Sequence, residues 1–316
     1  MKAKVLITGG AGFIGTSLAK YLLGKGLAVK TFDMYEPRNR ICEHHVGTIM
    51  FPHDLDRAMR GYDYVVHLAA ILGVRRTERE RTQCLDINII GTKNVLDACA
   101  KARVKKVVFA SSSEVYGNAQ RIPISESDPV SPNSVYAVTK LAGEEYVRAH
   151  SRMQGFRYSI VRLFNVYGPG QVAEFVLPRF VKSVLENIPP TVYGDGNQIR
   201  SFCHVTDAAQ GIYLALDRKG TDNQVFNIGN DKTAITVADL AKKVISVSGI
   251  SLKPRYIDMQ DADRSPEREI INRVPDISKA RTILRYRPTV SLDRGIKDLL
   301  KTGNIEETWF DPLTKK

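Results

Sequence analysis

Tyr136 and Lys140 lie four residues apart in Tyr136-Ala-Val-Thr-Lys140, a spacing that places both side chains on one face of a helix. A nearby ammonium group lowers the pKa of a phenol, so a tyrosine beside a lysine can act as a base near neutral pH. The preceding segment, Phe109-Ala-Ser-Ser-Ser-Glu-Val-Tyr-Gly117, carries Ser112, whose hydroxyl can relay a proton from a substrate alcohol. Loss of that proton lets the carbon-bound hydrogen leave as hydride to a nicotinamide. Such pairs also occur in helices by chance, so the prediction depends on the surrounding elements.

The start of the chain has the pattern of a dinucleotide-binding turn. An apolar run, Val5-Leu-Ile7, leads into Gly9-x-x-Gly12-x-x-Gly15, and the amphipathic stretch Thr16–Leu23 follows at helical spacing. In this context one glycine allows a tight turn, the next allows the backbone to approach a pyrophosphate, and the third allows close packing of helix and strand. The diphosphate is expected at the helix N-terminus, where free N–H groups and the helix dipole favour an anion.

An acidic residue at the end of the second strand indicates which dinucleotide is bound. The apolar run Leu27–Phe32 ends at Asp33, about twenty residues after the glycines. A carboxylate there accepts hydrogen bonds from the adenosine ribose and repels a 2′-phosphate, so we predict NAD rather than NADP. Arg38 and Arg40 lie just downstream and offer an alternative site for a 2′-phosphate.

Strand-like and helical runs alternate through the first half of the chain, which predicts an α/β fold of the Rossmann type, with a doubly wound parallel sheet. Further strands are expected at 47–51, 63–68, 105–111 and 156–162, and helices at 86–102 and 135–153. From about Phe164 the alternation loosens. We therefore predict a NAD-binding domain over residues 1–165, to which later segments can return, and a substrate lobe over 166–316.

Composition narrows the class of protein. The net charge is +12, but the basic residues are dispersed and no nucleic-acid-binding motif accompanies them, so no nucleic-acid partner is expected. No signal peptide or run of eighteen apolar residues is recognised, so no membrane association is expected. The four cysteines are scattered, which favours reduced thiols and a cytoplasmic location. His44 and His45 lack partners at metal spacing, so no metal is expected.

Taken together, these motifs resemble those of the extended short-chain dehydrogenase/reductase superfamily, and more narrowly its nucleotide-sugar epimerase/dehydratase branch. The resemblance runs from about residue 3 to residue 300. Besides the glycine turn and Tyr136-x-x-x-Lys140, it rests on the following segments: Asp54-Leu55, His67-Leu-Ala-Ala70, Asn88, Ser112, Arg162-Leu-Phe-Asn-Val-Tyr-Gly-Pro-Gly170, Val192–Phe202 and Pro275–Ala280.

The resemblance implies roles for individual residues. Tyr136 would be the catalytic base, Lys140 its partner and a ligand of the nicotinamide ribose, and Ser112 the hydroxyl that bridges to the substrate. Asp54 and Leu55 would flank the adenine, and Asn88 would brace the site. The full set of implied NAD contacts is Gly9, Gly12, Phe13, Ile14, Gly15, Asp33, Asp54, Leu55, Leu68, Ala69, Ala70, Asn88, Ser111, Tyr136 and Lys140.

The resemblance also implies a nucleotide-diphosphate sugar as substrate. Its implied contacts are Ser113, Asn165, Tyr193, Arg200 and an arginine of the segment Arg264-Ser-Pro-Glu-Arg268, in which Arg264 and Arg268 are both candidates. Guanidinium groups suit this work because their planar fork binds phosphate oxygens bidentately. A homodimer through a four-helix contact is expected by the same analogy.

The net reaction after C4 oxidation depends on Glu114. The resemblance favours a 4-epimerase, which needs only Ser112, Tyr136, Lys140 and NAD. Glu114 has the spacing of a dehydratase or decarboxylase glutamate and could remove the C5 proton, whereas Ser113 stands where many dehydratases have aspartate. Arg273 resembles a decarboxylase arginine, with a surface role as its alternative. A 4,6-dehydratase, a decarboxylase and a simple 4-oxidase stay open, as does a non-catalytic NAD-sensing protein.

Overall fold

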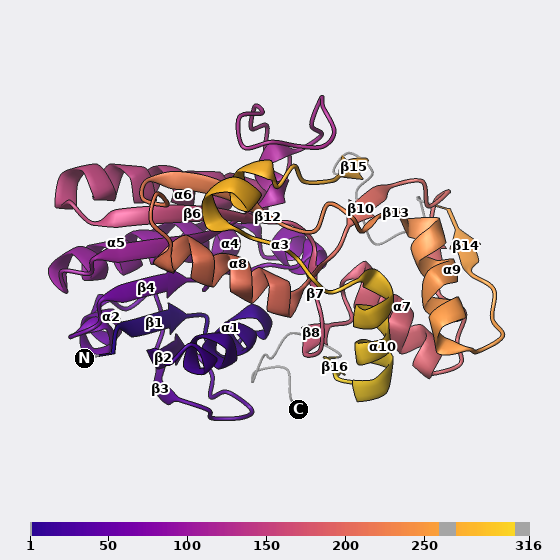
Figure 1. Ribbon diagram of the computed structural model, residues 1–316, viewed down its shortest axis with the longest axis horizontal. Coiled ribbons are helices and arrows are strands. Elements are labelled where there is room, and N and C mark those ends of the chain that lie inside the picture. The colour runs from indigo at the N-terminus through magenta and orange to yellow at the C-terminus, as the bar shows by residue number, and fades with distance from the viewer. Residues whose placement is uncertain (1, 259–269, 307–316) are drawn as a thin grey trace.

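A sheet of seven parallel strands forms the centre of the computed structural model, which describes residues 2–258 and 270–306 (Figure 1). The strand order is β12-β6-β5-β4-β1-β2-β3. The strands are β1 (Lys4–Thr8), β2 (Ala28–Asp33), β3 (Glu43–Val46), β4 (Tyr64–His67), β5 (Lys106–Ser112), β6 (Arg157–Leu163) and β12 (Gln224–Ile228). The chain reverses its direction across the sheet between β1 and β4, and ligands of such sheets bind at that switch point.

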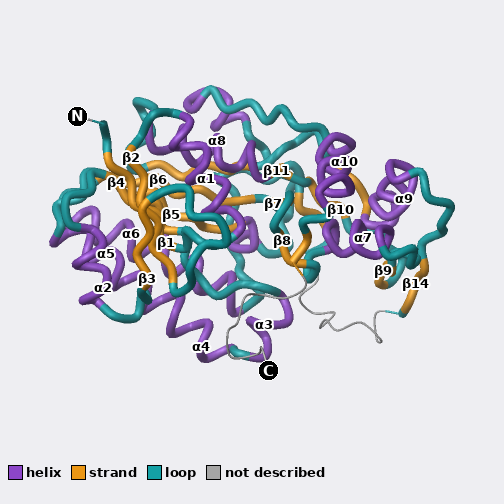
Figure 2. The backbone as a smooth tube through the Cα atoms, turned by 90° about the horizontal axis from the view of Figure 1, so that it is seen from below, coloured by secondary structure: helices purple, strands orange, loops and turns teal. Residues whose placement is uncertain are grey.

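Helices cover both faces of this sheet, as Figure 2 shows. One face carries α1 (Phe13–Gly24) and α8 (Val205–Asp217), and the other carries α2 (Pro52–Met59), α5 (Gly91–Lys101) and α6 (Val135–Gln154). Because side chains alternate along a strand, Val5 and Ile7 pack toward α1 whereas Leu6 packs toward α2 and α5.

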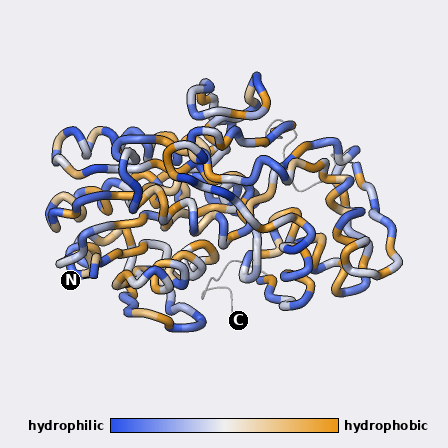
Figure 3. The backbone as a smooth tube through the Cα atoms, viewed as in Figure 1, coloured by the Kyte–Doolittle hydropathy of each residue, from blue (hydrophilic) through white to orange (hydrophobic). Residues whose placement is uncertain are grey.

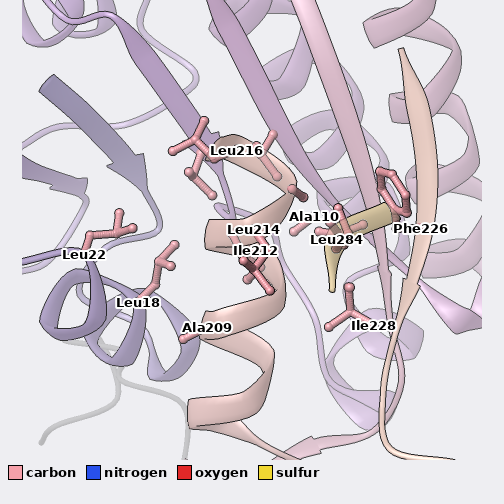
Figure 4. Packing of buried hydrophobic residues seen from close by; sticks show 14 of the residues in the cluster. Leu18, Leu22, Ala110, Ala209, Ile212, Leu214, Leu216, Phe226, Ile228 and Leu284 are labelled. Carbon is pink, nitrogen blue, oxygen red and sulfur yellow. The ribbon is translucent and has the colours of Figure 1, made fainter. Parts of the chain in front are cut away.

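The contact between α1 and α8 closes one of the two central cores (Figure 4). Leu18 and Leu22 of α1 lie beside Ala209 and Ile212 of α8, and all four side chains are fully buried. Burial of each large side chain of this kind contributes about 1.5–3 kcal/mol. The packing of α1 against α8 therefore fixes the position of the glycine turn that leads into α1.

A smaller lobe is built from α7 (Val176–Leu185), α9 (Val237–Ser248) and α10 (Leu292–Thr302), which share a third core. Figure 3 shows hydrophobic and hydrophilic positions mixed along these helices, as expected where one face meets a core. Short strands complete the lobe: β7 (Val166–Tyr167), β8 (Gln171–Val172), β9 (Thr191–Tyr193), β10 (Ile199–Ser201), β11 (Cys203–His204), β13 (Ala234–Thr236), β14 (Arg255–Ile257), β15 (Asn272–Arg273) and β16 (Ile305–Glu306).

The chain crosses between these two parts more than once. After the first segments of the lobe, α8 and β12 return to the central sheet, where β12 pairs with β6. The division at residue 165 stays a prediction about domains. The remaining elements are the helices α3 (Val74–Arg79) and α4 (Arg81–Leu85), the π-helical turns η1 (Asp86–Ile90) and η5 (Ala280–Leu284), and the 3₁₀ turn η2 (Ser113–Tyr116).

One expected strand was placed wrongly. The strand predicted at 47–51 lies instead at Glu43–Val46, where His44 pairs in register with Thr31 of β2. Residues 47–51 form a turn because the Thr48 N–H binds the Asp54 carboxylate and Pro52 starts α2. Across the described residues, no helix has the length and apolar character needed to cross a membrane.

Candidate active site

The glycine turn between β1 and α1 has no room for side chains at Gly9, Gly10 and Gly15. Gly9 adopts a φ of +73°, and a Cβ there would lie 2.7 Å from the Ala69 nitrogen. A Cβ on Gly15 would lie 2.2 Å from the Gly9 carbonyl oxygen. Gly12 is the N-cap of α1, and within the described part of the chain no side chain hydrogen-bonds the N–H groups of the first turn from this position. The N–H groups of the first turn, which begins with Phe13 and Ile14, can therefore bind a diphosphate, so the turn fits a dinucleotide.

Asp33 lies at the end of β2 beside this turn. Its carboxylate accepts hydrogen bonds from the Ala11 N–H at 3.0 Å and from the Tyr35 N–H at 3.4 Å. Burial raises its pKa although these bonds oppose the shift. The two downstream arginines have other partners: Arg38 forms an ion pair with Glu306, and Arg40 donates to the His44 carbonyl. This arrangement favours a ribose hydroxyl over a 2′-phosphate at Asp33.

Asp54 and Leu55 lie at the start of α2, where the adenine contacts are predicted. The Asp54 carboxylate accepts the Thr48 N–H at 3.3 Å and is partly buried. The Leu55 side chain is fully buried in the core with Phe32, so only its main chain could contact a cofactor.

The Asn88 side chain hydrogen-bonds the main chain of the segment that follows β4. Leu68, Ala69 and Ala70 follow β4, and the Asn88 side chain binds both main-chain groups of Ile71, accepting its N–H at 2.7 Å and donating to its carbonyl at 2.9 Å. Asn88 also donates to the Thr139 hydroxyl of α6 at 3.1 Å. It belongs to the π-helical turn η1, a deformation that is common at functional sites. Asn88 therefore braces the segment, as its predicted role requires.

The neighbouring His67 is a core residue. Its ring nitrogens bind the Thr8 and Thr92 hydroxyls at 2.7 and 3.0 Å, and burial lowers its pKa to about 3. It is neutral at physiological pH and has both nitrogens occupied, so it is not a proton shuttle.

The structure brings together Ser112, Tyr136 and Lys140 at the junction of β5 and α6. The Lys140 ammonium donates to the Ala110 carbonyl at 2.8 Å and lies 5.7 Å from the centre of the Tyr136 ring. The Ser112 hydroxyl accepts the Glu114 N–H at 3.1 Å and lies close enough to the Tyr136 phenol to lower its pKa. A proton on a substrate alcohol thus has a route through these two hydroxyls.

The electrostatics of this group differ from the expectation. Burial raises the pKa of Tyr136, and the Glu114 carboxylate raises it further, while Ser112 and Arg273 oppose the rise. Lys140 is itself buried, which lowers its pKa to about 8. Desolvation therefore sets the direction of the phenol's pKa shift in this arrangement, and a lowering of that pKa by Lys140 stays a prediction.

Ser111 was expected among the cofactor contacts, and the structure corrects this for its side chain. Ser111 is 3% exposed, and its hydroxyl donates to the Glu144 carboxylate at 2.6 Å. Side chains alternate along a strand, so Ser111 and Ser112 point to opposite faces of β5. The Ser111 hydroxyl is therefore hydrogen-bonded to α6 and does not face the cofactor side of β5.

A second polar cluster lies beside Tyr136 on the side of the small lobe. The Arg273 guanidinium lies 3.5 Å from the Glu114 carboxylate and 3.4 Å from the Asn165 amide oxygen to which it donates. Asn165 also donates to the Ser201 carbonyl at 2.9 Å. Ser113 is 2% exposed, and its hydroxyl has no hydrogen-bond partner in the described part of the chain.

Tyr193 and Arg200 lie farther out in the lobe. The Arg179 guanidinium stacks 4.6 Å from the centre of the Tyr193 ring, a contact that the sequence analysis missed. Arg200 donates to the carbonyls of Ile199 and Ile271. Arg264 and Arg268 lie outside the described residues.

The sequence analysis also missed the buried pair Glu144–Arg162. Glu144 continues the spacing of Tyr136 and Lys140 by another four residues, which places it on the same face of α6. The sequence did contain a signal for this pair, because a glutamate at position 144 on the same helix face as Tyr136 and Lys140 indicates a buried charge that needs a partner.

Comparisons with known proteins agree with this geometry. A family model described as the NAD-dependent epimerase/dehydratase family matches residues 5–229. The chain is 34% identical to a UDP-N-acetyl-alpha-D-glucosaminuronate decarboxylase of Bacillus cytotoxicus, over 95% of this chain and 98% of that protein.

Two solved structures are similar over nearly their whole length. A UDP-glucose 4-epimerase of Thermotoga maritima, solved with UDP-glucose, has a TM-score of 0.87 at 30% identity, covering 94% of this chain and 97% of that one. A UDP-glucuronic acid 4-epimerase of Bacillus cereus, solved with UDP-glucuronic acid and NAD, has a TM-score of 0.86 at 32% identity, covering 95% and 99%. These likenesses confirm the predicted fold class and NAD as the cofactor.

Proposed function

The chain belongs to the NAD-dependent epimerase/dehydratase family, and from that premise we propose that it is a 4-epimerase of a UDP-linked sugar. The observation that carries this proposal is the buried ammonium of Lys140, held by the Ala110 carbonyl 5.7 Å from the centre of the Tyr136 ring at the end of the strand that carries Ser112. Two of the similar structures are 4-epimerases solved with UDP-sugars. The proposed substrate contacts are Ser113, Asn165, Tyr193, Arg200 and an arginine among Arg264 and Arg268.

In the proposed mechanism NAD, when bound, supplies a reversible acceptor for the C4 hydrogen of the sugar. Tyr136 takes the proton of the C4 hydroxyl, directly or through Ser112. Lys140 is held by the Ala110 carbonyl, which keeps its ammonium near the phenol. When the hydrogen returns to the other face of C4, Tyr136 gives the proton back, so no further acid or base is required.

The direct test is incubation of the NAD-loaded enzyme with a panel of UDP-sugars. A 4-epimerase yields a product of unchanged mass with an inverted C4 signal in the NMR spectrum. The Tyr136→Phe variant is expected to lose at least about 100-fold in rate, because general acid–base groups contribute about 10²–10⁴-fold. Turnover at the parental rate in this variant would remove the assigned base.

A second candidate is oxidation at C4 followed by a change at C5 or C6, either loss of carbon dioxide from a uronic acid or loss of water. It is favoured by the placement of Glu114 and Arg273 in an ion pair next to Tyr136. A carboxylate there can remove a C5 proton, and a guanidinium can bind a C6 carboxylate. The decarboxylase among the relatives supports the same assignment.

Glu114→Gln separates the two candidates. For an epimerase the variant keeps its rate within a few-fold, because Glu114 takes no proton. For a dehydratase, which loses the C5 proton, it still reduces NAD with substrate but releases product more than about 100-fold more slowly. A decarboxylase breaks the C5–C6 bond without losing a C5 proton and is identified by product mass. Glu145→Gln is the matched control, since Glu145 lies on α6 but is exposed. Product mass gives an independent answer, because loss of carbon dioxide or water is read directly.

We also propose a homodimer and a cytoplasmic location. Ile90 and Val138, beside α5 and on α6, are 45% and 43% exposed, and these two helices pack side by side. Covering them with the same helices of a second copy would give a four-helix contact. Light scattering should give a dimer mass for the parent and a monomer mass for Val138→Arg. The four free cysteines support a reducing compartment.

A further inference from the structure

We propose that Ser111 is a positioning residue that fastens the end of β5 to α6 through Glu144 and so sets the Ser112 hydroxyl against the Tyr136 phenol. The inference rests on the proposed function, since it concerns the same oxidation step. It gives Ser111 a role that is different from contact with NAD or substrate.

Two successive residues of β5 are bound to two successive turns of α6. The Ala110 carbonyl accepts from Lys140 at 2.8 Å, and the Ser111 hydroxyl donates to Glu144 at 2.6 Å. Because Tyr136, Lys140 and Glu144 are spaced by four residues, these bonds fix one stripe of the helix along the strand end. The register of α6 on β5 determines how far the Tyr136 phenol lies from Ser112.

Glu144 is itself immobile, because both of its oxygens are occupied. Arg162 donates from Nε to Oε1 at 2.9 Å and from Nη2 to Oε2 at 2.8 Å, and Arg148 adds a bond to Oε2 at 3.1 Å. Burial acts to raise the pKa of Glu144, but the bonds from Arg162 and Ser111 outweigh it and hold the pKa below its usual value. The carboxylate therefore stays charged and offers Ser111 a fixed acceptor.

The same guanidinium supports the other side of Ser112. Arg162 stacks 4.7 Å from the centre of the Tyr116 ring, and the Tyr116 hydroxyl donates to the Asn227 amide at 2.7 Å. Tyr116 ends the turn η2, which begins directly after Ser112 and carries Glu114. The strand end before Ser112 and the turn after it are thus both attached to Arg162.

Removal of the Ser111 hydroxyl leaves the Glu144–Arg162 ion pair intact and releases only the strand end. Misplacement of reacting groups by about 1 Å costs up to about 100-fold in rate. We expect Ser111→Ala to slow NAD reduction by a bound sugar about tenfold, with the Kd for the sugar unchanged, since Ser111 does not contact it.

Ser159→Ala is the matched control. Ser159 is also fully buried, lies on the adjacent strand β6, and donates to the carbonyls of Ala215 and Thr221 away from the site. Both variants should show a similar fall in Tm, but Ser159→Ala should keep the rate of NADH formation within about twofold. An equal slowing in both variants, or none in Ser111→Ala, would overturn the proposal.

The pH dependence of NAD reduction in Ser111→Ala separates a loss of Ser112 positioning from a general loosening of the fold. The groups that face the Tyr136 phenol are Ser112, Glu114, Cys84 and Arg273, with Lys140 on the same helix. The nearby Ser112 hydroxyl lowers the phenol pKa, so a displaced Ser112 moves the rising limb of the rate to higher pH in Ser111→Ala. An unmoved limb would contradict the proposal. If Tyr136→Phe also keeps the parental rate, the proposed function fails instead.

Discussion

The two sides of the candidate site are built differently. The oxidation side rests on a seven-residue strand, β5, and a twenty-residue helix, α6, and its lysine is only 4% exposed. The sugar side rests on strands of two or three residues, and Asn165 adopts a φ of +34°, a conformation uncommon for residues other than glycine.

Burial and hydrogen bonding follow the same division for most of these groups, with a partly exposed Tyr136 and a buried Ser113 as exceptions. On the oxidation side, Lys140 and Ser111 donate to fixed acceptors in the interior. On the sugar side, Tyr193, Arg200 and Arg273 are all partly exposed. Groups on long packed elements are held more accurately than groups on loops, whereas loops tolerate substitution. The proposed oxidation chemistry thus lies on the rigid side of the molecule, and the proposed sugar contacts lie on its adaptable side.

The largest effect is expected from Lys140→Met, which removes the ammonium from the rigid side. The rate of NAD reduction should fall about 100- to 1,000-fold, in the range of general acid–base groups. Single-turnover NADH formation measures this. Lys242→Met, at an exposed lysine on α9 in the lobe, should keep the parental rate. A small effect in the first variant would mean that Tyr136 acts without its ammonium partner.

The same variant has a pH signature in stability. Burial lowers the pKa of Lys140 from 10.5 to about 8, so between pH 8 and 10.5 the unfolded chain binds more protons than the folded one. The free energy of unfolding of the parent, relative to Lys140→Met, should therefore rise with pH across this window by up to about 3 kcal/mol. Denaturant titrations of the NAD-free proteins measure it. Lys242, whose pKa is raised by Asp239, should give no such rise.

Gly15→Ala is the next largest test of the rigid side. The new Cβ would lie 2.2 Å from the Gly9 carbonyl oxygen, so the backbone of the turn must shift. Overpacking of this kind costs about 1–3 kcal/mol, which corresponds to about 5- to 150-fold in the Kd for NAD. Calorimetric titration of NAD into the apoprotein provides the measurement.

Gly24→Ala is its control on the same helix, because a Cβ there meets nothing within 4 Å. This variant should bind NAD as the parent does. If both variants bind NAD equally well, the turn is adaptable, and the contrast between the two sides of the site is wrong.

Local spacing explains what the sequence could predict. The glycine turn, Asp33 and the pair Tyr136–Lys140 lie within single strand–turn–helix units or one helix face, so their geometry follows from periodicity. The orientation of Ser111 was predictable in principle from strand alternation with Ser112, but not its partner. That partner depends on the packing of α6 against β5.

Other features depend on contacts between distant segments. Asn165 and Arg273 are 108 residues apart, and the contacts of Arg273 with Asn165 and with Glu114 depend on the pairing of β15 with β10. The pKa of Tyr136 depends on desolvation, which spacing does not reveal. The strand lies at Glu43–Val46 and not at 47–51 because the Asp54 carboxylate accepts the Thr48 N–H and holds residues 47–51 in a turn.

The smallest effect is expected where the two sides meet at the edge of the glycine turn. Gly170, next to β8, lies within reach of Phe13: a Cβ on it would be 3.9 Å from that ring. β16 pairs with β8 and carries Glu306, which forms an ion pair with Arg38 on the far side of the turn. Glu306→Gln should release NAD about two- to fivefold faster, because exposed ion pairs contribute about 0.2–1 kcal/mol.

Stopped-flow displacement of NADH by excess NAD measures this release rate. Asp97→Asn removes the contacts of an exposed carboxylate on α5 with Lys93 and His150 and should leave the rate unchanged. High salt should speed release from the parent toward the Glu306→Gln rate, since salt screens exposed charges. If release instead keeps the parental rate in Glu306→Gln at low salt, the lobe does not restrain the cofactor through this pair. Retention of NAD would then depend on the contacts predicted on the central sheet and its helices, among them the glycine turn and Asp33, which would place the whole cofactor site on the rigid side.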